Sequence, residues 1–140
     1  MVRKNPRMLD LYLLPLKPTL LEDTLAFLEQ EIDDAALEAT GLSGQGALGT
    51  GQPMGAAELR EELGDRILRD EVEGYLAYVD GRPAALCVTA SGPQAGVVVL
   101  LLVAPRHRKL GLARRLVEAA GARFAAEGLA FEGYARKRVG

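Results

Sequence analysis

The chain has 140 residues, a length that suits one ordinary domain with its own hydrophobic core and is too short for two. Hydrophobic residues make up 49% and charged residues 26%, a balance that excludes a disordered or fibrous chain. The formal net charge of -2 argues against a general nucleic-acid binder, and one cysteine with one histidine excludes a Cys/His zinc cluster within the chain. We expect a single domain over residues 1–140, with no metal and no nucleic-acid partner.

Neither a membrane segment nor a targeting signal is predicted. The basic start is interrupted by Asp10 and Pro15, and no small-residue cleavage site follows it. The longest apolar run, 97–105, is far shorter than the roughly 20 residues that span a bilayer. Cys87 has no partner for an intrachain disulfide, which indicates a reducing, cytoplasmic setting.

A strand, a helix and a glycine-rich loop are predicted first along the chain. Residues 9–16 are β-prone until Pro15, which is typical of a strand at a sheet edge. Residues 19–32 carry leucines at helical spacing, and Thr19 three residues before Glu22 predicts a capping box. The loop 41–55 contains GQGALG, but no strand precedes this pattern and no helix opens from it, so a lid or linker is favoured over a dinucleotide site.

The second half alternates strands and helices. A helix is predicted for AAELREELGDRIL, two strands around the turn Asp80-Gly81, and a strand buried on both faces for VVVLLLV. A helix then carries one apolar face, made of Leu112, Leu116, Ala120 and Phe124. LAFEGYA, residues 129–135, predicts a last strand that lies parallel to the buried one. The expected order is β-α-α-β-β-β-α-β, a layered α/β (α+β) fold.

The stretch RHRKLGLARR connects the buried strand to the helix. Its five cations are Arg106, Arg108, Lys109, Arg114 and Arg115. Cations at a helix N-terminus oppose the helix dipole, whereas an anion bound there is stabilised by free N–H groups and by arginine. Small residues at 111 and 113 let such an anion approach the backbone. The stretch therefore predicts a phosphate or polyphosphate site.

The segment LLVAPRHRKLGLARRLVEAA resembles the cofactor-binding motif of the GCN5-related N-acetyltransferases (GNATs), V-x-P-x-x-[RQ]-x-x-G-x-[GA]. Val103, Pro105, Arg108, Gly111 and Ala113 fill its fixed places. The resemblance implies a mixed, splayed β-sheet flanked by helices. It also implies acetyl-CoA as cosubstrate, with its pantetheine arm between the buried strand and the last strand. The implied cofactor-binding residues are Leu101, Leu102, Val103, Arg108, Lys109, Leu110, Gly111, Leu112, Ala113 and Arg114.

Catalytic residues are less well defined by the resemblance. Relatives usually protonate the departing thiolate with a tyrosine that follows the motif, and the one tyrosine in that region is Tyr134. No carboxylate lies in VVVLLLV to act as a base, and Glu71, Glu73, Glu22 and Asp23 are expected to be solvated charges. His107 is expected to face solvent or phosphate, and the default for Cys87 is a buried thiol rather than a nucleophile.

Two functions stay open at this stage. One is direct acetyl transfer to an amine acceptor, a small molecule or a peptide, without a covalent enzyme intermediate. The other is a non-catalytic CoA or acyl-CoA sensor or regulatory module. The family's C-terminal closing strands have no counterpart in the printed sequence, and an uncovered last strand would favour a homodimer.

Overall fold

The computed structural model describes residues 10–35, 54–108 and 110–134. The predicted order of strands and helices is confirmed in these residues, with two short 3₁₀ turns, Pro18–Leu20 and Pro105–His107, in addition. The strands are β1 (Leu11–Pro15), β2 (Glu73–Val79), β3 (Arg82–Ser91), β4 (Ala95–Val103) and β5 (Ala130–Tyr134); the helices are α1 (Leu21–Glu31), α3 (Ala56–Leu68) and α4 (Leu112–Ala126).

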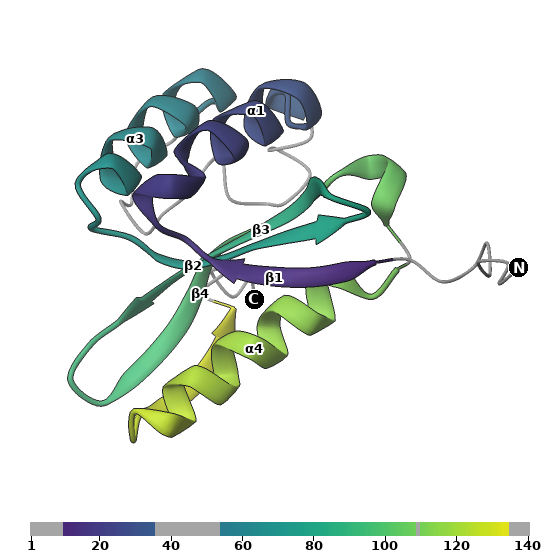
Figure 1. Cartoon of the computed structure of the whole chain (residues 1–140). Helices are drawn as coiled ribbons and strands as arrows, with labels where there is room; N and C mark the ends of the chain where they lie inside the picture. Colours follow the sequence, from purple (N-terminus) through teal and green to yellow (C-terminus); the bar gives the residue numbers. More distant parts are fainter. Residues whose placement is uncertain (1–9, 36–53, 109, 135–140) are drawn as a thin grey trace, which may run out of the picture.

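The five strands form one mixed sheet in the order β1-β2-β3-β4-β5. The pairs β1–β2, β2–β3 and β3–β4 are antiparallel. The pair β4–β5 is parallel, as predicted. Helices α1 and α3 cover one face of the sheet and α4 covers the other (Figure 1). The fold is therefore a three-layer α+β arrangement with β1 at an edge.

Each face of the sheet has its own core. Leu59, Leu63 and Ile67 of α3 are fully buried against one face, in the helical spacing predicted from the sequence. The predicted apolar face of α4 is buried against the other, together with Cys87. The continuous apolar sequence of β4 is explained by its position, because one of its faces lies in each core.

Helix α1 begins later than the sequence predicted. Pro18 starts a 3₁₀ turn that continues to Leu20, so Leu20 is the N-cap of α1 and no side chain caps it. The predicted capping box of Thr19 and Glu22 is therefore wrong. The pattern GQGALG, residues 44–49, lies outside the described residues.

A buried tyrosine anchors the start of α1 to the sheet. The Tyr78 hydroxyl of β2 donates a hydrogen bond of 2.6 Å to Oδ2 of Asp23, and the Tyr78 ring stacks on Tyr12 of β1 with 5.0 Å between centroids. Burial, and then the neighbouring Asp23 carboxylate, raise the pKa of the Tyr78 hydroxyl, which stays a proton donor. Asp23 is thus a packing partner as well as a surface charge, contrary to the prediction.

Gly96 of β4 provides a stability test of the α4 core. A Cβ added there would lie 2.4 Å from the buried Phe124 ring, so that ring has to move if alanine is introduced. We expect Gly96→Ala to lower the free energy of unfolding by about 1–3 kcal/mol, as overpacking does elsewhere. The measurement is urea unfolding. Gly92→Ala, where an added Cβ has open space, should change stability little, and equal stability of both variants would contradict this packing.

Candidate functional site

The connection from β4 to α4 is set by one glycine. Gly111 precedes α4 with φ +75°, in the left-handed region that glycine adopts without steric cost. An added Cβ would meet no atom within 4 Å, so the backbone conformation, rather than crowding, requires glycine here. The chain can therefore turn abruptly from Arg108 into the first residue of the helix.

The N-terminus of α4 presents free backbone donors. The N–H of Arg115 donates to the Gly111 carbonyl at 3.0 Å, the first hydrogen bond of the helix. The three preceding amides, at 112, 113 and 114, have no acceptor within the helix, no side chain caps Gly111, and the first turn has no acidic residue. With the helix dipole added, this end of α4 is suited to bind an anion such as a pyrophosphate.

The four described arginines near this end differ in their ion-pair partners. Arg106 donates to Glu31 of α1 over 2.5 Å, which ties the connection to the opposite layer. Arg114 lies 3.5 Å from Glu118, four residues later on the same face of α4. Arg108 and Arg115 are exposed and form no ion pair with another described residue, so they are the cations best placed for a ligand.

Strand β5 pairs with the N-terminal half of β4. The pairs Ala95 with Ala130, Gly96 with Phe131, and Val98 with Tyr134 join the two strands, and within the described residues the register stops there. From Leu100 to Val103, the partner of β4 among the described residues is β3. The described residues thus show the mixed, open sheet that the resemblance implied, and the C-terminal half of β4 leads through the connection to the N-terminus of α4.

Strand β4 has a bulge opposite β3. Val88 of β3 pairs with Leu100 of β4, whereas the next residue, Thr89, pairs with Val98. Val99 is thus the extra residue of β4, and both Val99 and Leu100 contribute to the core beneath α1 and α3. The alternation of β4 therefore changes directly after Val98, the last residue of β4 that pairs with the described part of β5.

The predicted catalytic candidates lie in different surroundings. Tyr134 is the last described residue of β5 and pairs with Val98; its side chain lies outside the description, as does Lys109. His107 is half-buried, and its Nδ1 has no hydrogen-bond partner among the described residues. Glu71 and Glu73 are exposed but lie close to arginine, at 3.5 Å and 3.3 Å respectively.

Cys87 is a packing residue, as predicted, and its thiol offers a simple test. The residue is completely buried, and burial raises its pKa from 9.0 to about 12, although Arg123 acts in the opposite direction. We expect the native protein to resist alkylation at pH 8 and the urea-unfolded protein to react quickly. Because the folded pKa is the higher one, stability should also fall as pH rises above about 9. Rapid labelling of the folded protein at pH 8 would contradict the burial.

Arg123 is the residue that sequence reasoning underestimated. Its Nε lies 4.0 Å from Glu127, a pair that i,i+4 spacing favours, but Nη2 also donates to Thr89 Oγ1 at 2.8 Å and to Glu73 Oε1 at 3.3 Å. The guanidinium lies 4.9 Å from the centroid of the Phe124 ring. Arg123 therefore joins α4 to β2 and β3, a role that no local sequence pattern indicates.

Two further properties concern metals and membranes. Among the described residues, no group of three or more His, Cys, Asp or Glu side chains is placed to hold a metal ion. None of the described helices combines the length and apolar character needed to cross a bilayer.

Comparisons with known proteins agree with this geometry. Residues 50–132 match the model of the acetyltransferase (GNAT) family. A GCN5-related N-acetyltransferase from Ralstonia eutropha is similar in structure, with a TM-score of 0.59, 20% identity, and coverage of 91% of this chain and 85% of the other. No curated protein sequence matches the chain.

Two other solved structures share the fold. An aminoglycoside N-acetyltransferase, AAC(6')-Iy in complex with CoA, has a TM-score of 0.60 at 16% identity, covering 97% of this chain and 82% of its own. A ribosomal-protein-alanine N-acetyltransferase from Brucella melitensis has a TM-score of 0.58 at 20% identity, covering 94% and 82%.

Proposed function

Because the chain belongs to the GNAT family of acetyltransferases, we propose that it transfers the acetyl group of acetyl-CoA to an amine acceptor. One observation carries the proposal: the uncapped N-terminus of α4 lies next to the C-terminal half of β4, which has no partner in the described part of β5. The first can bind a pyrophosphate, and the second can pair with the amides of a pantetheine arm. A single extended ligand that has both groups fits this arrangement.

The binding roles follow from the position of each residue. The amides from Leu112 to Arg114 bind the pyrophosphate, with the guanidinium of Arg108 as an additional donor. The turn that includes Leu110 and Gly111 presents these amides, and Lys109 belongs to the same turn by sequence. Backbone groups of 101–103 that point away from β3 pair with the pantetheine arm.

The chemistry is a direct acyl transfer. The acceptor reacts as the free amine, because an ammonium ion has no lone pair. The nitrogen lone pair forms a bond to the thioester carbonyl carbon, the carbon–sulfur bond breaks, and its electron pair leaves with sulfur. The proton lost by nitrogen ends on the thiolate, so the products are an amide and the CoA thiol. An N–H of the free β4 edge stabilises the carbonyl oxygen as negative charge develops on it.

Release of the CoA thiol in the presence of amines tests this function. Acetyl-CoA is incubated with the protein and a panel of mono-, di- and polyamines, and free thiol is measured over time. Thiol release that requires both protein and amine supports acetyl transfer. Binding of acetyl-CoA without release by any amine would favour the alternative, a non-catalytic CoA sensor. Absence of binding would overturn both.

Tyr134 is our candidate for the acid that protonates the thiolate. Tyr134 lies in β5 opposite Val98, in the last described pair of the two strands. We expect Tyr134→Phe to lower kcat by about 100-fold, the scale of general acid catalysis, while the Kd of acetyl-CoA stays unchanged. Tyr12→Phe, on the far edge strand, is the matched control. Unchanged kcat in Tyr134→Phe would remove this residue from the mechanism.

A further inference from the structure

One ion pair joins the connection between β4 and α4 to the opposite layer of the fold. Arg106 lies in the 3₁₀ turn Pro105–His107, directly after β4, and its Nη2 donates to Oε2 of Glu31 over 2.5 Å. Glu31 is the last residue of α1, 75 residues earlier in the chain. Because α1 and α4 cover opposite faces of the sheet (Figure 1), this pair links the residues that precede α4 to the layer of α1 and α3.

The surroundings of Glu31 make this partner important. Its side chain is only 13% exposed, so water solvates the carboxylate poorly. It also lies at the C-terminal end of α1, where the helix dipole disfavours negative charge, and the last turn of α1 contains no basic residue. The charge-assisted hydrogen bond from Arg106 offsets both costs. Arg106 is therefore restrained by Glu31 and is not free to follow a ligand.

The end of α1 is itself fixed to α3. Asp34, shortly after Glu31, accepts a hydrogen bond of 2.7 Å from the N–H of Ala56, the first residue of α3. Ile32, the C-cap of α1, is buried in the core beneath both helices. Glu31 thus occupies a defined position in the α1 and α3 layer, and Arg106 takes its own position from it.

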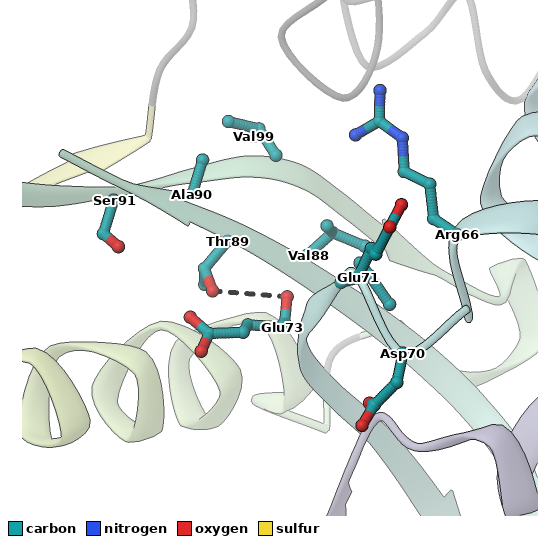
Figure 2. A pocket seen from close by; sticks show the side chains of 10 residues that line it. Arg66, Asp70, Glu71, Glu73, Val88, Thr89, Ala90, Ser91 and Val99 are labelled. Carbon is teal, nitrogen blue, oxygen red and sulfur yellow. Dashed lines mark hydrogen bonds between the residues drawn. The ribbon is translucent and has the colours of Figure 1, made fainter. Parts of the chain in front are cut away.

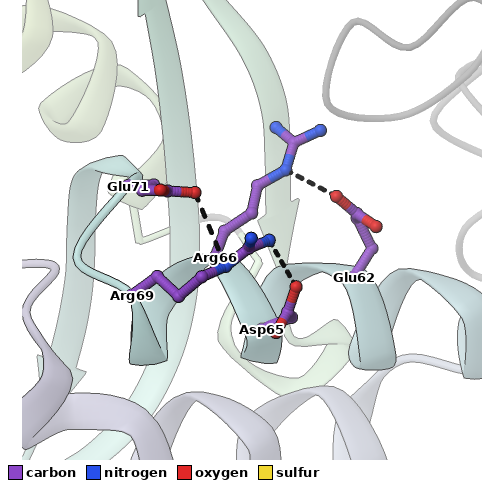
Figure 3. A network of polar contacts seen from close by, with 5 residues as sticks. All are labelled: Glu62, Asp65, Arg66, Arg69 and Glu71. Carbon is purple, nitrogen blue, oxygen red and sulfur yellow. Dashed lines mark hydrogen bonds and ion pairs between the residues drawn. The ribbon is translucent and has the colours of Figure 1, made fainter.

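The ion pairs at the end of α3 are of a different kind. Figure 3 shows this network, in which Arg66 contacts Glu62, and Arg69 contacts both Asp65 and Glu71. Its members are close together in the chain, and their carboxylates are at least 40% exposed. Surface pairs of this type contribute little to stability or placement. The pair at the end of α1 differs in both respects, since its members are far apart in the chain and its carboxylate is largely buried.

A second ion pair between distant elements lies toward the other end of α4. Arg123 contacts the Glu73 carboxylate of β2 at 3.3 Å, and Thr89 Oγ1 donates to the Glu73 carbonyl at 3.2 Å (Figure 2). Glu73, Thr89 and Val99 line a pocket of about 420 Å³ at this place (Figure 2). Arg123 lies about 16 Å along the helix from its first residue. This pair therefore joins α4 to the sheet without contacting the connection from β4.

We propose that Glu31 is a positioning residue for the cofactor: through Arg106 it holds the connection so that the free amides of α4 point toward the pyrophosphate. Among the described residues from 104 to 111, Arg106 is the one whose side chain forms an ion pair with another described element. Gly111 sets the shape of the turn, and the ion pair sets its placement on the fold. This inference rests on the proposed binding of acetyl-CoA and adds to it a residue outside the family motif.

Calorimetric titration of acetyl-CoA into Glu31→Ala tests the inference, because two explanations predict opposite signs. If charge alone mattered, removing a carboxylate and releasing Arg106 as a free cation would tighten the binding of an anion. We expect the Kd to rise about tenfold instead, a typical size for coupling between sites, because the amides lose their placement. The Arg106→Ala variant should also bind more weakly, and the double variant should have the Kd of Arg106→Ala, because both changes break one contact.

Two controls match this change. Glu29→Ala removes an exposed carboxylate from the same helix, and Glu73→Ala breaks the ion pair with Arg123. Both should keep the wild-type Kd. Unchanged or tighter binding in Glu31→Ala, or additive losses in the double variant, would overturn the inference and leave acetyl-CoA binding in place.

A second measurement applies if the wild type binds no acetyl-CoA, a result that would overturn the proposed function. The heteronuclear ¹H–¹⁵N NOE of residues 110–113 should fall in ligand-free Glu31→Ala, and an unchanged value would overturn the positioning role as well. If Glu31→Ala does not fold, Arg106→Ala is titrated in about 0.5 M salt, where long-range attraction is screened. Its weaker binding should persist there, and a wild-type Kd would contradict the inference.

Discussion

Replacing Gly74 with alanine should leave the protein largely unfolded. Gly74 has φ +154°, and an added Cβ would lie 2.0 Å from the Cys87 carbonyl oxygen and 2.9 Å from the Val88 Cα. These are backbone atoms of the paired strand β3, so the contact cannot be relieved by a side-chain rotation. We expect a loss of more than about 4 kcal/mol, which is most of the 5–15 kcal/mol that stabilises a typical domain.

Far-UV circular dichroism and urea unfolding measure this effect. Gly128→Ala is the matched control, because Gly128 also has a positive φ, +76°, but an added Cβ there meets no atom within 4 Å. The control should lose about 1 kcal/mol, the cost of a left-handed conformation alone. A Gly74→Ala variant as stable as the control would contradict the close approach of β2 and β3.

The second large effect concerns the ligand rather than the fold. We expect Gly111→Val to weaken acetyl-CoA binding by at least about 100-fold, because a β-branched residue disfavours φ +75° and the turn then misdirects the free amides of α4. Loss of two charge-assisted hydrogen bonds accounts for that factor. Since Gly111 is exposed with open space around it, stability should fall by only about 1–2 kcal/mol.

Calorimetric titration of acetyl-CoA measures the change. Gly128→Val offers the same substitution at a similar φ, +76°, but at the C-terminal end of α4. This control should keep the wild-type Kd. Equal acetyl-CoA affinity of the wild type and Gly111→Val would show that the α4 N-terminus is not part of the binding site, whatever the stability of the variant.

Much of the fold was predictable because its signals are local. The buried face of α4 follows from helical spacing, and the hairpin turn at Asp80 and Gly81 has the positive φ values, 51° and 81°, that its dipeptide favours. The motif from Val103 to Ala113 identified the family. Each signal lies within a few residues, so tertiary contacts did not have to be known.

The rest depends on contacts between distant segments. By sequence, Arg106 was one of the five cations of the predicted phosphate site, but it donates a hydrogen bond to Glu31, 75 residues away. Arg123 and Thr89 meet across 34 residues, and the bulge at Val99 is visible only in the strand register. No periodicity encodes such pairings, and the pocket that they border could not be predicted. The homodimer stays a prediction.

An NMR titration with CoA tests the central claim most directly. The chain is small enough for amide spectra, and each backbone amide near the ligand reports on it. We predict the largest shifts at two places: the first turn of α4, residues 112–114, and the free edge of β4, residues 101–103. Shifts confined to other regions, such as the outer surface of α1 and α3, or no shifts at millimolar CoA, would contradict the account.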